Sequence, residues 1–120
     1  MKQIIPRKTS DGLKFKIGYP ADYPVNRFSF NSEFNIYILR DHEGIRILSA
    51  RCTHLGCIIE KSDNGFICPC HGSCFDDEGR VLSGAAPVDL PWLKSYLSAD
   101  GKIVVEPGKY ISSEKKLFIT

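Results

Sequence analysis

The chain is patterned as a series of short strands. Apolar and polar residues alternate at Phe28–Phe30 and over part of Leu13–Ile17, and β-branched or aromatic runs occupy Asn35–Arg40 and Ile45–Ser49. The sequence Asp-His-Glu-Gly separates the last two runs. A short Gly-containing connection between two such runs predicts an antiparallel hairpin.

Turn sequences mark further strands toward the C-terminus. A turn sequence with Asp and Gly precedes or begins each of three further apolar runs, at Gly65–Cys68, Arg80–Leu82 and Lys102–Glu106. Seven prolines punctuate the chain, and no window carries a helical period. We therefore expect one antiparallel all-β domain, a sandwich or a barrel.

Composition limits the classes of function. The 120 residues suffice for one domain, and 16 basic against 14 acidic residues give a net charge of only +2, which predicts no nucleic-acid partner. No apolar run approaches the length of a membrane span, and the N-terminus lacks the apolar region of a secretory signal. We expect any membrane association to come through partner subunits or an anchor that this sequence lacks.

Cysteine and histidine are concentrated in two short segments. Cys52–Cys57 reads C-T-H-L-G-C and Cys68–Gly72 reads C-P-C-H-G, with Cys74 two residues further on. Such clustering indicates a site, whereas a disulfide scaffold would spread its cysteines along the chain. The third histidine, His42, lies in the hairpin connection and is expected to be a surface residue.

Four interpretations of the two segments compete. A structural zinc site uses Cys and His, but zinc fingers pair like ligands, whereas each segment here mixes a thiol with an imidazole. A thioredoxin-type motif needs two residues between its cysteines and a helix, and a catalytic Cys–His pair leaves four further ligand-type residues unexplained. The fourth interpretation is a 2Fe–2S cluster with two Cys and two His ligands.

The paired segments, C-T-H-L-G-C followed by C-P-C-H-G-S, resemble the cluster-binding loops of Rieske iron–sulfur proteins. The resemblance covers about residues 46 to 87 and is closest to the Rieske subunits of cytochrome bc and b6f complexes. It implies the Rieske fold: an antiparallel β-sandwich base with a smaller cluster-binding subdomain inserted. We expect that subdomain at about residues 48–88 and base sheets from residues 1–47 and 89–120, in a single domain of residues 1–120.

The resemblance also implies one Rieske-type 2Fe–2S cofactor and its ligands. Cys52 and Cys68 would hold the inner iron, and His54 and His71 would hold the outer iron, with their imidazoles reaching toward solvent. The same two histidines would carry the coupled transfer of an electron and a proton.

Two further cysteines match a disulfide in the same family. Cys57 and Cys70 correspond to the pair found in the quinol-oxidising class and usually lacking in Rieske ferredoxins and in the Rieske domains of ring-hydroxylating oxygenases. The other possibility is that both remain reduced as small buried residues. Cys74 has no counterpart in the motif and is expected to be a free, buried thiol.

The residues after the ligands are expected to tune the cluster and cover it. Ser73 matches a serine that donates a hydrogen bond to a bridging sulfide, which raises the potential. Phe75 stands where high-potential members have a tyrosine, so we expect a lower potential that suits a low-potential quinol such as menaquinol. Gly72 follows the second ligand histidine, and Pro87 ends a segment, Gly-Ala-Ala-Pro, that resembles the family's covering loop. Leu55 would lie at the exposed tip between the loops.

The function implied is electron transfer within a larger assembly rather than stand-alone catalysis. The domain would take an electron and a proton from quinol beside a cytochrome b subunit and pass the electron to a c-type cytochrome. A disulfide implies the extracytoplasmic face of an energy-transducing membrane. Three alternatives stay open: a subunit of an arsenite-oxidase-like molybdoenzyme, a soluble Rieske ferredoxin and a zinc-binding interaction domain.

Overall fold

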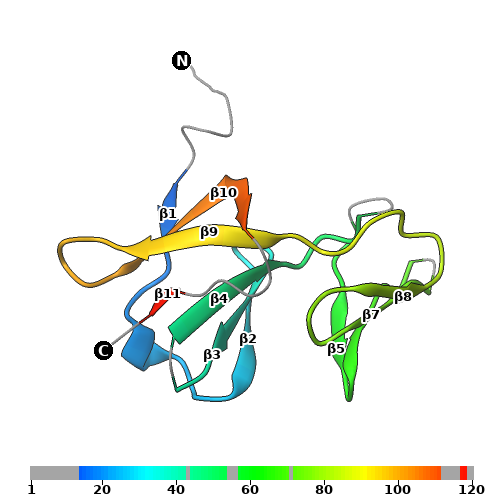
Figure 1. The fold of residues 1–120 in the computed structure, drawn as a ribbon, viewed down its shortest axis with the longest axis horizontal. Helices are drawn as coiled ribbons and strands as arrows, with labels where there is room; N and C mark the ends of the chain where they lie inside the picture. The colour runs from blue at the N-terminus through cyan, green and yellow to red at the C-terminus, as the bar shows by residue number, and fades with distance from the viewer. Residues whose placement is uncertain (1–13, 43, 54–56, 71, 112–116, 119–120) are drawn as a thin grey trace.

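The computed structural model describes residues 14–42, 44–53, 57–70, 72–111 and 117–118 (Figure 1). Within these ranges the regular structure is almost entirely β, as the sequence pattern predicted, and the one helical element is a short 3-10 turn. The elements are β1 (Phe15–Lys16), η2 (Pro20–Asp22), β2 (Arg27–Asn31), β3 (Ile36–Arg40), β4 (Gly44–Ser49), β5 (Glu60–Ser62), β6 (Gly65–Ile67), β7 (Cys74–Asp76), β8 (Val81–Ser83), β9 (Trp92–Leu97), β10 (Ile103–Ile111) and β11 (Leu117–Phe118). No helix in the described residues has the length and apolar character needed to cross a membrane.

Most strands belong to one large antiparallel sheet. Its order is β1-β10-β9-β4-β3-β2, and β11 pairs with β4. The predicted hairpin is confirmed, since β3 and β4 pair antiparallel with Ile38 opposite Ile47. His42 lies in the connection of this hairpin and is exposed, as expected.

A second, four-stranded sheet is formed by consecutive antiparallel strands in the order β5-β6-β7-β8. Figure 1 shows β5, β7 and β8 at one end of the molecule, with β1 and β11 toward the other end. The division into a cluster-binding subdomain and base sheets stays a prediction. In the structure, the chain leaves the large sheet after β4, forms the small sheet and returns to the large sheet at β9.

Four strands were absent from the sequence prediction, namely β5, β7, β9 and β11. β5 is exposed along its length, and β7 and β11 are too short for an apolar alternation to be read from the sequence. β10 also continues well beyond the predicted Glu106, past Pro107, because a register shift between Glu106 and Tyr110 accommodates the proline.

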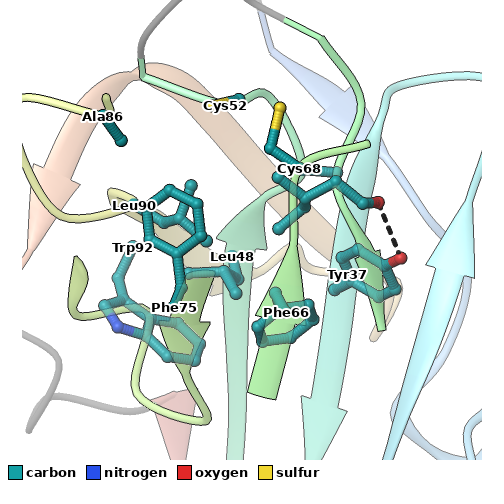
Figure 2. Packing of buried hydrophobic residues seen from close by; sticks show 11 residues of the cluster. Tyr37, Leu48, Cys52, Phe66, Cys68, Phe75, Ala86, Leu90 and Trp92 are labelled. Atoms are coloured by element: carbon teal, nitrogen blue, oxygen red, sulfur yellow. Dashed lines mark hydrogen bonds between the residues drawn. The ribbon is translucent and has the colours of Figure 1, made fainter. Parts of the chain in front are cut away.

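The buried side chains form two clusters. One lies within the large sheet and is built mainly from isoleucine and valine of β3, β4 and β10. The other joins the two sheets (Figure 2). In it Phe66 of β6 packs against Phe28 and Tyr37 of the large sheet, with ring centroids 5.1 and 5.0 Å away.

A polar contact also joins the two sheets. The Arg46 guanidinium of β4 lies 4.5 Å from the Trp92 ring and donates a 2.8 Å hydrogen bond to the Glu78 carboxylate, in the turn after β7. The indole N–H of Trp92 donates to the Glu78 carbonyl at 2.9 Å. Both contacts join the turn after β7 of the small sheet to β4 and β9, the central strands of the large sheet.

Candidate functional site

Two six-residue loops that both begin with cysteine form the centre of the site. Cys52–Cys57 follows β4, and Cys68–Ser73 connects β6 to β7. In each loop the N–H of the first residue donates to the carbonyl of the sixth, at 2.6 Å from Cys52 to Cys57 and 2.8 Å from Cys68 to Ser73. The same closure therefore places a cysteine at the base of each loop.

Both of these cysteines are buried. Cys52 is 3% and Cys68 is 1% exposed, and they belong to the same core cluster as Phe66 and Phe75. Figure 2 shows them at one end of that cluster. Neither takes part in the disulfide. Two thiols in an apolar setting, one from each loop, are the ligands that iron–sulfur clusters use, so the donor set fits the expected cofactor.

A disulfide ties the two loops together. Cys57, at the end of the first loop, is bonded to Cys70 in the second, with their Cα atoms 6.5 Å apart. This confirms the pairing that the resemblance implied and excludes the alternative of two reduced cysteines. The sulfur of Cys68 lies within 4.8 Å of both disulfide sulfurs, so the bond stands directly beside one expected ligand.

The histidine half of the ligand set lies outside the described residues. His54, Leu55 and His71 are among the positions that the structure does not describe, so their expected roles stay predictions. Gly72, the next residue, is exposed and has φ +75°, a backbone conformation that glycine adopts without strain.

Ser73 is fully buried and its hydroxyl has a fixed partner. The Oγ atom accepts a 3.1 Å hydrogen bond from the backbone N–H of Ala86. Because the oxygen accepts there, the hydroxyl proton is left to be donated elsewhere. This is the arrangement required by the expected role of Ser73 as a donor toward the cluster, although the role itself stays a prediction.

A third segment, residues 84–88, lies against this serine. Gly84 has φ +96°, and a Cβ added to it would lie 2.5 Å from the Cα of Ser73. Only glycine therefore permits the approach. Ala86 is buried in the shared core, whereas Pro87 is exposed. The sequence analysis selected Pro87 and missed the amide of Ala86, since a backbone donor carries no signal in the residue type.

The three segments are joined in pairs. The disulfide joins the first loop to the second, and Ala86 joins the third segment to Ser73 of the second loop. Thr53 joins the first loop to the third segment, because its hydroxyl donates a 2.6 Å hydrogen bond to the carbonyl of Val88. The sequence analysis did not identify Thr53 or Val88. Three cross-links in a closed set hold the base of the site rigid.

The first two residues of β7, Cys74 and Phe75, point to opposite faces of the small sheet. Phe75 is 1% exposed, lies opposite Phe66 in the sheet and points into the core that holds Cys52 and Cys68. Neighbouring residues of a strand alternate between faces, so Cys74 points away from the core. The expectation that Cys74 is buried is therefore wrong: its thiol is partly exposed and lies 3.5 Å from the carbonyl of Gly72.

The sequence profile of the Rieske [2Fe-2S] domain matches residues 15–96. The chain is 43% identical over 75 residues to the cytochrome b6-f complex iron-sulfur subunit of Synechococcus elongatus, covering 60% of this chain and 42% of that protein. It is 31% identical over 111 residues to the corresponding subunit of Chlorobaculum thiosulfatiphilum, covering 87% of this chain and 61% of that protein. The chain thus spans about half the length of these relatives.

A solved structure shares the fold. The plasma membrane Rieske protein PetC3 from the cyanobacterium Synechocystis PCC 6803 superposes with a TM-score of 0.55 at 28% identity. The alignment covers 76% of this chain and 97% of that structure.

Proposed function

Because the chain belongs to the Rieske [2Fe-2S] domain family, we propose that it transfers single electrons from a quinol to a cytochrome within a bc-type or b6f-type complex. One structural observation supports this assignment within the family: the Cys57–Cys70 disulfide joins the two cysteine-containing loops. Its pairing matches the quinol-oxidising class. The two relatives, both subunits of cytochrome b6-f complexes, support the same assignment.

The residues of the site have separate roles in binding the cluster and in tuning its potential. Cys52 and Cys68 would hold the inner iron, and the apolar core around them would exclude water from that side. His54 and His71 would complete the ligand set. When bound, a Rieske cluster accepts and releases one electron at a time. The hydroxyl of Ser73, held by Ala86, donates a hydrogen bond that favours the added negative charge.

The histidines also accept the proton that the quinol releases. A neutral imidazole that binds a metal through one nitrogen has a second nitrogen available for a hydrogen bond. The second nitrogen of His54 or His71 accepts a hydrogen bond, and then the proton, from the quinol hydroxyl.

The partners and the compartment follow from this proposal. The quinol is oxidised beside a cytochrome b subunit, and a c-type cytochrome receives the electron. The disulfide persists in an oxidising compartment, so the domain works on the extracytoplasmic face of the membrane. Phe75, buried among the core residues and without a hydroxyl, favours a quinol of low potential.

A pH-resolved redox titration of the purified protein tests the assignment. We expect the optical and EPR spectra of a Rieske cluster and a midpoint potential that falls with rising pH in the alkaline range. We also expect reduction by a menaquinol analogue, and His71→Cys should weaken the pH dependence, because one of the two titrating imidazoles is then removed. A potential independent of pH, or no reduction by quinols, would instead favour a ferredoxin-like or molybdoenzyme-associated module without quinol chemistry.

A further inference from the structure

The outward side of the β1, β10 and β9 edge of the large sheet is rich in lysine. Phe15 and Val105 face each other in the register and pack toward the core, so the residues beside them in each strand point outward. We define the lysine face by its side chains Lys14, Lys16, Lys94, Lys109 and Glu106. The four lysine side chains are each about half exposed.

Glu106 lies at the centre of this face. Its carboxylate lies 3.8 Å from the ammonium of Lys14, 3.7 Å from that of Lys94 and 3.7 Å from that of Lys109. The Glu106 side chain is only 7% exposed, whereas the three ammonium groups reach solvent. One carboxylate thus gathers three cations at one place and neutralises one of them.

Positive charge is in excess on the lysine face. Lys16, the fourth lysine of the face, pairs with Asp100 at 3.2 Å. Four lysines and two carboxylates leave a net charge of +2 on this part of the sheet.

A tyrosine accompanies the lysines. Tyr96 lies beneath Lys14, with the ammonium 5.8 Å from the ring centroid, and both side chains line a shallow groove of about 290 Å³ together with Lys16. Tyrosine is enriched where proteins meet the headgroup level of a membrane.

We propose that the lysine face rests on an anionic phospholipid surface. All four cations are lysines, which act as hydrated point charges, whereas paired recognition of a single phosphate or carboxylate favours the planar fork of arginine. The Glu106 carboxylate already occupies the point on which three of the cations converge, so the solvent-facing sides of the half-exposed lysines suit an extended anionic surface better than one further ion. The face and its proposed ligand are independent of the electron-transfer site.

The attraction between the lysine face and an anionic membrane should be modest. It should grow with each lysine and weaken when salt is added. Each lysine near an anionic membrane contributes an amount equal to about a fivefold change in affinity. The interaction decays over a Debye length of about 8 Å at physiological ionic strength, so binding should weaken steeply when salt is added.

Vesicle sedimentation with the cluster-loaded protein tests the proposal. The probes are phosphatidylcholine vesicles with and without phosphatidylglycerol. We expect binding only when phosphatidylglycerol is present, with an affinity about 25-fold lower for the double variant Lys94→Gln/Lys109→Gln. Glu106→Gln removes the central negative charge and should raise the affinity about fivefold, a change that general damage to the fold would not produce.

A variant with the same net charge serves as the control. Lys61→Gln/Arg80→Gln removes two positive charges from the small sheet, away from the lysine face, and should bind the anionic vesicles as the unmodified chain does. Equal losses in the two double variants, or no gain with Glu106→Gln, would overturn the proposal. Retention on immobilised polyglutamate without binding to the vesicles would assign the face to an acidic protein and would also overturn it.

Discussion

The backbone N–H of Ala86 donates a 3.1 Å hydrogen bond to the hydroxyl oxygen of Ser73, thirteen positions earlier in the chain. This bond fixes a fully buried hydroxyl whose proton is then directed away from Ala86. It depends in turn on Gly84, since a side chain there would collide with Ser73. A backbone amide in one segment thus sets the orientation of a side chain in another.

Removal of the Ser73 hydroxyl should lower the midpoint potential. If Ser73 donates to the cluster as we propose, Ser73→Ala removes a hydrogen bond to a charged group, about 1.5–3 kcal/mol, which corresponds to about 60–130 mV for one electron. A redox titration followed by circular dichroism or EPR measures the shift. Gly84→Ala should lower the potential in the same direction while Ser73 is still present, and an unchanged potential in both variants would contradict the positioning role.

A hydroxyl added at Phe75 should raise the potential. Phe75→Tyr places an O–H donor in the buried cluster of side chains that contains Cys52 and Cys68, where a bond to a ligand sulfur would favour the reduced state by on the order of 60 mV. Phe66→Tyr, in the neighbouring strand of the same core, is the matched control and should leave the potential unchanged. Equal shifts in the two variants would show that the effect is not specific to position 75.

Loss of the disulfide should destabilise the folded domain. Cys57 and Cys70 are separated by 13 positions, and closing a loop of this size contributes about 3 kcal/mol to the free energy of unfolding. The double variant Cys57→Ala/Cys70→Ala should therefore unfold at a lower urea concentration and lose its cluster sooner on dilution. Cys74→Ala, outside the disulfide, should change neither measurement by a comparable amount.

Neutralising Glu78 should weaken the contact between the two sheets. Glu78→Gln removes the carboxylate that accepts the hydrogen bond from Arg46, whose side chain is only 11% exposed. We expect a loss of about 1–3 kcal/mol in the free energy of unfolding by urea, because a largely buried guanidinium loses the negative charge of Glu78 beside it. Asp77→Asn breaks the more exposed pair with Lys61 and should cost less than about 1 kcal/mol. Equal costs would mean that the Arg46 contact does not join the sheets.

Asp76 should make stability depend on pH in the acidic range. Burial acts to raise the pKa of Asp76, but hydrogen bonds from the backbone of Arg80 and Glu78 and from the Arg80 guanidinium outweigh it and lower the pKa. A carboxyl with a lowered folded-state pKa stabilises the fold above its unfolded value of about 3.9, and this stabilisation is lost as pH falls through the lower folded value.

Urea unfolding at several pH values checks this account. Asp76→Asn should be less stable than the unmodified chain at neutral pH, and the difference should shrink as pH falls below about 4. A difference that stays constant with pH would mean that the carboxylate charge of Asp76 contributes nothing. Asp77→Asn, at the next and more exposed position, gives the reference for a carboxylate removed from the same turn.

Much of this protein was determined by the sequence alone. The paired Cys and His segments, with their fixed spacing, indicated the family, the cofactor and the disulfide, because a cluster with mixed ligands demands those residue types at short range. The β3–β4 hairpin followed from two apolar runs and the turn between them. These features depend on neighbours in the sequence, so their signals are local.

Only the tertiary structure decided the rest. The amide of Ala86 and the carbonyl of Val88 act through backbone atoms that every residue type shares, so no sequence pattern could select them. The outward position of Cys74 depends on the register of a three-residue strand, and β5 lacks any apolar alternation. The lysine face likewise brings Lys14 and Lys16, at the start of the described chain, beside lysines of β9 and β10 near its end. Contacts between distant segments depend on how the sheets pair, and pairing is set by the packing of the whole core.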